Sequence, residues 1–131
     1  MKYILIVSIL SVFLPLNAMA CRCSEVTILQ KMDKSDYVYF GRITEATLRN
    51  DDSVENKLKI IETVKGKPDS NILLSYAREH NMCSMYAATG LTYIVYGKYK
   101  ETPKLTLCSK SHVLLEGLDE QMAKIRDAAN Q

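Results

Sequence analysis

Two cysteines separated by a single residue, in Cys21-Arg22-Cys23, constrain this chain more than any other feature. A disulfide needs a Cα–Cα separation of roughly 4.4–6.8 Å and a fixed dihedral angle, so two cysteines this close do not easily bond to each other. In an oxidising compartment each pairs with a distant partner, and the chain offers Cys83 and Cys108. The tripeptide is therefore predicted to be fastened at two points to one small domain; composition alone leaves three connectivities open.

Residues 1–20 have the pattern of a secretory signal peptide. Lys2 supplies the positive charge, Ile4 to Leu14 the apolar stretch, and Ala18-Met19-Ala20 the small-residue cleavage site. The apolar stretch is too short to span a bilayer comfortably. Cleavage after Ala20 would make Cys21 the first residue of a mature domain at 21–131, which we expect to be secreted or periplasmic.

A lipid anchor on Cys21 is the alternative, because bacterial lipoproteins are acylated on a cysteine that directly follows the signal sequence. That processing usually requires a larger aliphatic residue three positions earlier, where this chain has Ala18. Acylation would also consume one of four thiols, whereas an even number of cysteines suits two disulfides in an oxidising compartment. We therefore expect soluble export.

Charge and length exclude further classes of function. The 131 residues suffice for one ordinary domain, and 16 basic and 15 acidic residues remain once the leader is set aside. With basic and acidic residues this evenly balanced, the domain has no excess of positive charge that would attract nucleic acid or an anionic membrane. We expect a monomer with neither a nucleic-acid partner nor a membrane span.

Hydrophobic periodicity and turn signals predict a mainly β domain with a helix at each end. The first helix is predicted at about 25–34 with Ser24 as its cap, and the last at about 114–129. Strands are predicted at 37–48, 54–64, 71–76, 91–99 and 104–109. No helix intervenes between strands, which excludes a parallel α/β sheet. Five short antiparallel strands fit an OB-like Greek-key barrel.

The same periodicity predicts which side chains share a face, and in the second strand it predicts that the apolar face is buried. Gly41 inside the first strand indicates a bulge or sharp coiling. Three sets of residues are each expected to share one face: Leu58, Ile60 and Val64 in the second strand; Ile72, Leu74 and Tyr76 in the third; Leu115, Leu118, Met122, Ile125 and Ala129 in the last helix.

Residues with catalytic chemistry are scattered. His80 and His112 lie in no metalloprotease pattern, and the serines have no nucleophile-elbow glycines around them. We expect no enzyme activity and no cofactor. A less favoured reading is a metal carrier, in which the histidines and methionines join a thiolate pair, because structural zinc sites usually have C-x2-C spacing.

The tyrosines allow a second alternative. Stacked on a barrel, they would bind the bases of a nucleic acid, but in strands such rings more often pack inside with the hydroxyl in water. The near-neutral charge of an exported chain argues for packing. The residues concerned are Tyr37, Tyr39, Tyr93, Tyr96 and Tyr99.

These motifs together resemble the N-terminal domain of the tissue inhibitors of metalloproteinases, within the wider netrin-module family. The resemblance covers nearly all of the mature chain. It rests on the cysteine pair after a signal peptide, on Val64-Lys65-Gly66, on the C-x6-G-x2-Y-x3-G spacing of Cys83, Gly90, Tyr93 and Gly97, and on Leu105-Thr106-Leu107-Cys108. It implies disulfides between Cys21 and Cys83 and between Cys23 and Cys108.

The resemblance also implies a mechanism. In the inhibitors, the free α-amino group and the carbonyl oxygen of the first cysteine chelate the catalytic zinc of the protease. That role would fall to Cys21, and the side chain of Arg22 would enter the specificity pocket. Cys23 and Ser24 would extend the inhibitory ridge, with Asn81 and Met82 beside it.

Arg22 departs from the pattern, because the animal inhibitors carry a small hydroxyl residue at that position. Burying a guanidinium without a partner costs several kcal/mol. The alternative function is therefore a netrin-type module that binds an extracellular or envelope protein without inhibiting a protease.

Overall fold

The structure, a computed structural model, describes residues 21–77 and 83–131; the predicted signal peptide lies outside this range. The fold is mainly β, with five antiparallel strands in one sheet and two helices, as the alternation of the sequence predicts. In chain order the elements are α2 (Ile28–Asp33), β1 (Tyr37–Leu48), β2 (Ser53–Lys65), β3 (Ile72–Tyr76), β4 (Thr92–Gly97), β5 (His112–Leu114) and α3 (Leu118–Ala129).

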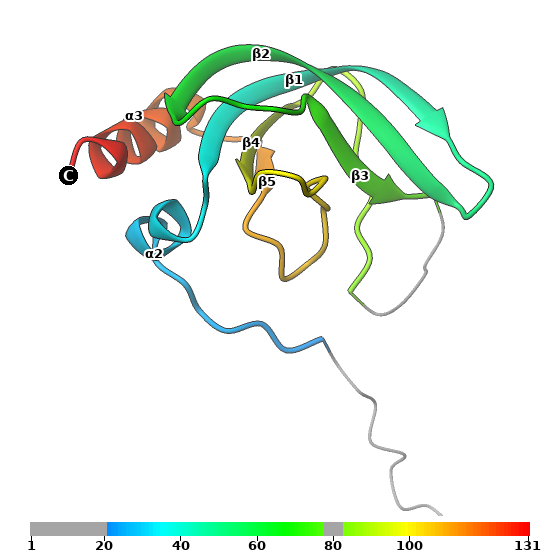
Figure 1. The fold of residues 1–131 in the computed structure, drawn as a ribbon, viewed down its shortest axis with the longest axis horizontal. Coiled ribbons are helices and arrows are strands. Elements are labelled where there is room, and N and C mark those ends of the chain that lie inside the picture. Colours follow the sequence, from blue (N-terminus) through cyan, green and yellow to red (C-terminus); the bar gives the residue numbers. More distant parts are fainter. Residues whose placement is uncertain (1–20, 78–82) are drawn as a thin grey trace, which may run out of the picture.

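The sheet is built around β1, which lies between β2 and β4 in the order β3-β2-β1-β4-β5. Figure 1 shows β1 and β2 as two long, strongly curved strands that run beside each other. Three register shifts interrupt their pairing, one of them between Phe40 and Gly41. The bulge predicted at Gly41 is therefore confirmed, and it contributes to the coiling of the sheet.

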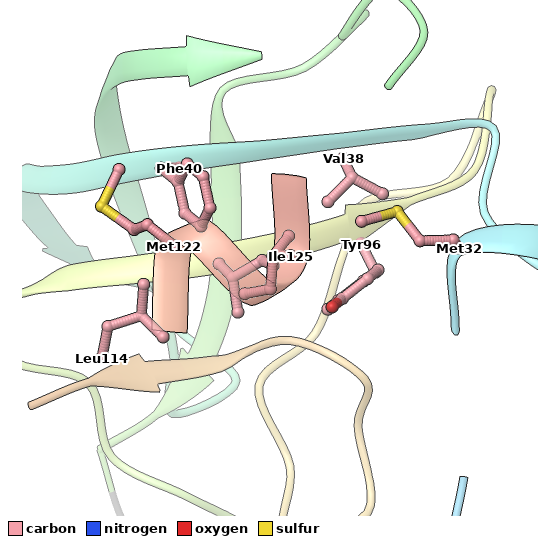
Figure 2. Close-up of a cluster of buried hydrophobic side chains, with 8 residues drawn as sticks. Met32, Val38, Phe40, Tyr96, Leu114, Met122 and Ile125 are labelled. Atoms are coloured by element: carbon pink, nitrogen blue, oxygen red, sulfur yellow. The ribbon is translucent and has the colours of Figure 1, made fainter. Parts of the chain in front are cut away.

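Two hydrophobic clusters lie on opposite faces of the sheet. Side chains alternate along β1 and β4, so Val38 and Phe40 belong to the cluster that the helices cover, and Tyr37 and Tyr39 to the other. Figure 2 shows Met122 and Ile125 of α3 and Met32 of α2 packed on the first cluster. The centre of the sheet is consequently buried on both sides.

Both helices begin later than predicted. Thr27 caps α2, where its hydroxyl accepts the Gln30 N–H at 3.2 Å and the Gln30 side chain accepts the Thr27 N–H at 3.0 Å. This reciprocal capping box outcompetes Ser24, which lies in a segment without regular secondary structure. Gly117 precedes α3 in a left-handed conformation, so Leu115 lies outside the helix and is 65% exposed.

The fifth strand is the largest correction. β5 is at His112–Leu114, whereas residues 104–109 form two isolated bridges, from Lys104 to Leu74 and from Thr106 to Ser84. A turn explains why: the Ser109 N–H donates to the Thr106 carbonyl at 3.1 Å, which ends the extended segment before it becomes a strand. The Leu105 side chain is buried, but Leu107 is 55% exposed.

The burial of β2 and β3 follows the pattern only in part. In β3, Ile72, Leu74 and Tyr76 share one face as predicted, but that face is only partly buried, and the fully buried side chains, Leu73 and Ser75, lie on the other face. In β2, Leu58 is buried and Val64 packs partly on the core, but Ile60 is 37% exposed. β3 pairs with β2 up to Lys57, so Ile60 lies on a part of β2 beyond that pairing.

No helix among the described residues is long and apolar enough to cross a membrane.

Candidate functional site: the disulfide-fastened ridge

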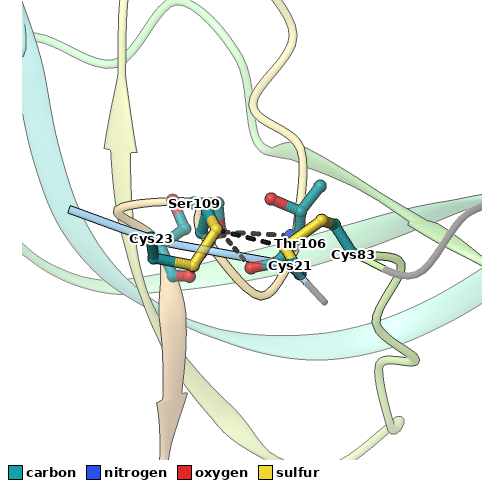
Figure 3. The surroundings of a disulfide bond; sticks show 7 residues. Cys21, Cys23, Cys83, Thr106 and Ser109 are labelled. Atoms are coloured by element: carbon teal, nitrogen blue, oxygen red, sulfur yellow. Dashed lines mark hydrogen bonds between the residues drawn. A yellow bond between two sulfur atoms is a disulfide. The ribbon is translucent and has the colours of Figure 1, made fainter. Parts of the chain in front are cut away.

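The candidate site is the segment Cys21–Ser24, which has no regular secondary structure. Disulfides join Cys21 to Cys83 and Cys23 to Cys108, with Cα–Cα separations of 5.5 and 5.1 Å. This is the pairing that the family resemblance implies. Figure 3 shows both disulfides side by side, with the N-terminal segment crossing the segments that carry Cys83 and Cys108.

The two segments that receive the disulfides are bonded to each other. The Leu107 N–H donates to the Cys83 carbonyl at 2.8 Å, and Ser84 and Thr106 form an antiparallel bridge. The Ser109 hydroxyl holds the adjoining turn, since it accepts the Thr106 N–H at 3.1 Å. We call residues 83–85 and 103–109 the platform. Because its two parts are paired, the two disulfides fasten the N-terminal segment to a single support.

The platform is in turn fixed to the edge of the sheet. The Leu74 N–H of β3 donates to the Pro103 carbonyl at 2.9 Å, and the Leu105 N–H donates back to the Leu74 carbonyl at 2.7 Å. Two residues on, the Tyr76 N–H donates to the Met85 carbonyl at 3.3 Å. Leu105 is buried in the cluster around Tyr39, so the support is continuous with the core.

Arg22 stands exposed between the two disulfides, and Ser24 is exposed beyond them. Among the described residues Arg22 has no ion-pair partner. Two of the predicted ridge residues, Asn81 and Met82, lie outside the described range, as does His80. The described part of the ridge therefore presents a backbone, a guanidinium and a hydroxyl to the surroundings.

A residue that the sequence analysis missed lies beside the ridge. A cavity of about 150 Å³ has Cys23, Ser24, Leu107 and Cys108 among its lining residues. In a regular strand Leu107 would point the same way as Leu105, but the turn exposes it next to the Cys23–Cys108 disulfide. The signal for it was the short Thr106–Ser109 segment, whose serine suits a turn better than a strand end.

The sulfur atoms form a tight group. The Cys21 and Cys108 sulfurs are 3.3 Å apart, and those of Cys21, Cys83 and Cys108 all lie within 4.8 Å of one another. None of the four described cysteines is free. A metal carrier would need thiolates, so in this oxidised form the cysteines cannot serve as its ligands.

The remaining sequence candidates have packing roles. His112 is half-buried, its Nδ1 is 3.1 Å from the Lys110 carbonyl oxygen, and burial lowers its pKa. Four of the five tyrosines are buried and cannot stack on a base; Tyr99 is 47% exposed. The expectation of wet hydroxyls is wrong for Tyr39 and Tyr96, whose hydroxyls are buried with no hydrogen-bond partner among the described residues.

Comparison of the chain with protein-family models gives no match, and comparison with curated proteins gives none either. The resemblance to the inhibitor family therefore depends on the motifs alone.

Proposed function

We propose that the mature domain is an exported inhibitor of zinc metalloendopeptidases that binds through its N-terminal ridge. The observation that carries this proposal is the double fastening of residues 21 and 23 to one paired platform, with Arg22 exposed between them. A short segment held this way keeps one conformation, so little conformational entropy is lost when a target binds.

The chemistry requires signal cleavage after Ala20. Cleavage frees the α-amino group of Cys21, which must be neutral to donate its lone pair to a metal. Its reference pKa of roughly 7.7–8.0 makes deprotonation inexpensive at neutral pH. The Cys21 amine and carbonyl oxygen would then occupy the coordination position that a catalytic zinc keeps open for water.

We also propose that the sheet is of the OB type and is completed as a barrel by the platform. The two hydrogen bonds between Leu74 and residues 103–105 support this, because they continue the sheet past the β3 edge. Slow exchange of the Leu74 and Leu105 amide protons in the oxidised protein is the expected result. If the Leu74 and Leu105 amide protons both exchange as fast as that of Thr89, an exposed residue, the barrel proposal is contradicted.

One added alanine before Cys21 tests the inhibitory mechanism. The extension converts the primary amine into a peptide nitrogen and places bulk at the metal, so inhibition of a panel of zinc proteases should be abolished. Acetylation of the Cys21 amine should do the same. An alanine added after Gln131 is the matched control and should leave inhibition unchanged. Melting temperatures of all forms should agree, since neither change touches the core.

The second candidate is a protein-binding module without protease chemistry, and the exposed guanidinium of Arg22 favours it. If the alanine-extended protein binds its partner as tightly as the unextended protein, chelation is wrong and this second function replaces the first.

A further inference from the structure

A second cavity, separate from the ridge residues, lies between the end of β4 and the chain that leads into β5. Its volume is about 510 Å³. In Figure 1 this is the region where the yellow and orange loop after β4 returns toward β5. Its lining includes three lysines, Lys98, Lys104 and Lys110, but a single carboxylate, that of Glu101. The lining therefore carries an excess of positive charge.

The three cavity lysines have no carboxylate within ion-pair distance among the described residues. The ion pairs between described residues join Arg49 to Glu55, Lys124 to Glu120 and Arg126 to Glu62, and include none of the cavity lysines.

Lys110 approaches the C-terminal end of α2, where its Nζ donates to the Lys34 carbonyl at 3.4 Å. Burial lowers the pKa of Lys110, and the charges of Lys98 and Lys34 lower it further. Ammonium groups crowded in this way repel one another, and a bound anion would relieve the repulsion.

The walls of the cavity are held in place by hydrogen bonds. Ser111 is buried, and its hydroxyl accepts the Tyr96 N–H at 3.0 Å. Pro103 is buried and bonded to β3 through its carbonyl. The Ser109 hydroxyl donates to the Ser111 carbonyl at 2.8 Å. The lysine backbones are therefore fixed around the cavity before any ligand arrives, which favours binding.

From this placement we propose that the cavity binds a doubly charged oxyanion, a phosphate group that is free or carried on a sugar. Ammonium groups of lysine are point donors well suited to such oxygens. The volume exceeds what a phosphate ion needs and leaves room for an attached ring. None of the ridge residues 21–24 lines this cavity, which shares Pro103, Lys104 and Ser109 with the platform, so the two proposals can be tested separately.

The test is a titration of the oxidised mature protein with inorganic phosphate at constant ionic strength, followed by amide NMR shifts. Saturable shifts are expected at Gly97, Lys98 and Ser111. Lys110→Gln should weaken binding about tenfold, which corresponds to about 1.4 kcal/mol. Lys59→Gln removes the same charge from an exposed position on β2 and should leave the affinity unchanged.

A hexose phosphate and the unmodified hexose distinguish the two sources of the phosphate group. Tighter binding of the hexose phosphate than of inorganic phosphate supports a sugar-borne group; equal binding supports the free ion. The neutral hexose should not bind. Shifts that fail to saturate, or an equal loss of affinity in the Lys59→Gln and Lys110→Gln variants, would overturn the proposal. Melting curves show whether each variant is folded.

Discussion

Gly97 is a residue at which a single added methyl group has no room. It lies directly opposite Tyr37 in the pairing of β1 with β4, and a Cβ atom there would overlap the tyrosine ring and hydroxyl. Tyr37 is fully buried, stacks on Tyr39 with 6.0 Å between ring centroids, and has little freedom to move. Gly97, the last glycine of the C-x6-G-x2-Y-x3-G spacing, thus leaves room for an aromatic ring.

Gly97→Ala should destabilise the domain by about 3 kcal/mol, the upper end of typical overpacking. Chemical denaturation of the oxidised protein measures this. Gly90→Ala is the comparison, because Gly90 has a φ of 89° but no atom within 4 Å of the added Cβ. It should cost about 1–2 kcal/mol from backbone conformation alone. Equal losses in the two variants would mean that Tyr37 does not require the space.

Under the inhibitory proposal, Arg22 would determine which specificity pockets the ridge accepts. If the inhibitory proposal is right, Arg22→Thr should strengthen inhibition of proteases with apolar pockets by about tenfold or more, about 1.4 kcal/mol, because no guanidinium needs to be desolvated. Arg22→Glu should weaken binding to any target with an acidic pocket. Inhibition constants measure both effects. A panel in which all three proteins inhibit equally would remove Arg22 from the contact.

Among the elements, α2 depends on a lysine that lies far away in the sequence. The Lys65 ammonium donates to the Met32 carbonyl at 2.6 Å and to the Ser35 carbonyl at 2.7 Å, which satisfies the open C-terminal end of the helix. The next residue, Gly66, has a φ of 63°, and a Cβ there would overlap the Asp36 carbonyl oxygen. The Val64-Lys65-Gly66 motif is therefore a helix cap as well as a turn.

Lys65→Met should destabilise the domain by about 2 kcal/mol, since it leaves two carbonyls without a charged donor while keeping most of the apolar stem. Equilibrium denaturation provides the value. Lys67→Met, at an exposed position two residues away, should change stability by less than about 0.5 kcal/mol. Similar values for the two variants would show that the ammonium does not stabilise α2.

Prediction from the sequence was most accurate for elements whose bounds and buried face follow from the local hydrophobic pattern. β1 has the bounds predicted for it, and Leu118 and Ala129 lie on the core-facing side of α3 as predicted, although Leu115 does not. It failed where hydrogen bonds between distant segments compete with propensity. Residues 104–109 have strand composition, but their turn and their bonds to β3 make them a platform.

The candidate site was also predicted only in part. The spacing of Cys21 and Cys23, one residue apart, predicts that the N-terminal segment is fastened to the domain. A turn at Thr106–Ser109 exposes Leu107 and places the platform segments so that they pair. No local pattern in the sequence identifies the distant residues to which this segment bonds. The cavity lysines recur six residues apart between β4 and β5, but no local pattern indicates that the turns between them place all three around one cavity.

At the scale of the whole molecule, the buried tyrosines predict loss of stability at high pH. Burial, then Asp69, raises the pKa of Tyr37 to about 12, and burial raises that of Tyr96 to about 12; the pKa of Tyr39 is also raised. The unfolded chain loses these protons near its ordinary value of about 10, before the folded chain does. The folded state then holds more protons, so the free energy of unfolding falls as pH rises from about 10 to 12.

Denaturation at about pH 8 and about pH 11 measures this slope. Tyr39→Phe removes one buried hydroxyl and keeps the ring, so the decline in stability should be shallower. Tyr86→Phe, at a 62% exposed position, is the control and should leave the slope unchanged. An unchanged slope in the Tyr39 variant would contradict this account.

The spacing of the disulfides also sets an order of assembly. Polypeptides are made from the N-terminal end, so Cys21 and Cys23 are synthesised before the residues that secure them. Their partners lie 62 and 85 positions further along the chain. Cys23 must therefore stay unpaired with Cys108 until nearly every strand has been synthesised. The first segment of the domain to be made is among the last to become rigid, so a chain interrupted before Cys108 carries the ridge residues but cannot hold them in their binding geometry.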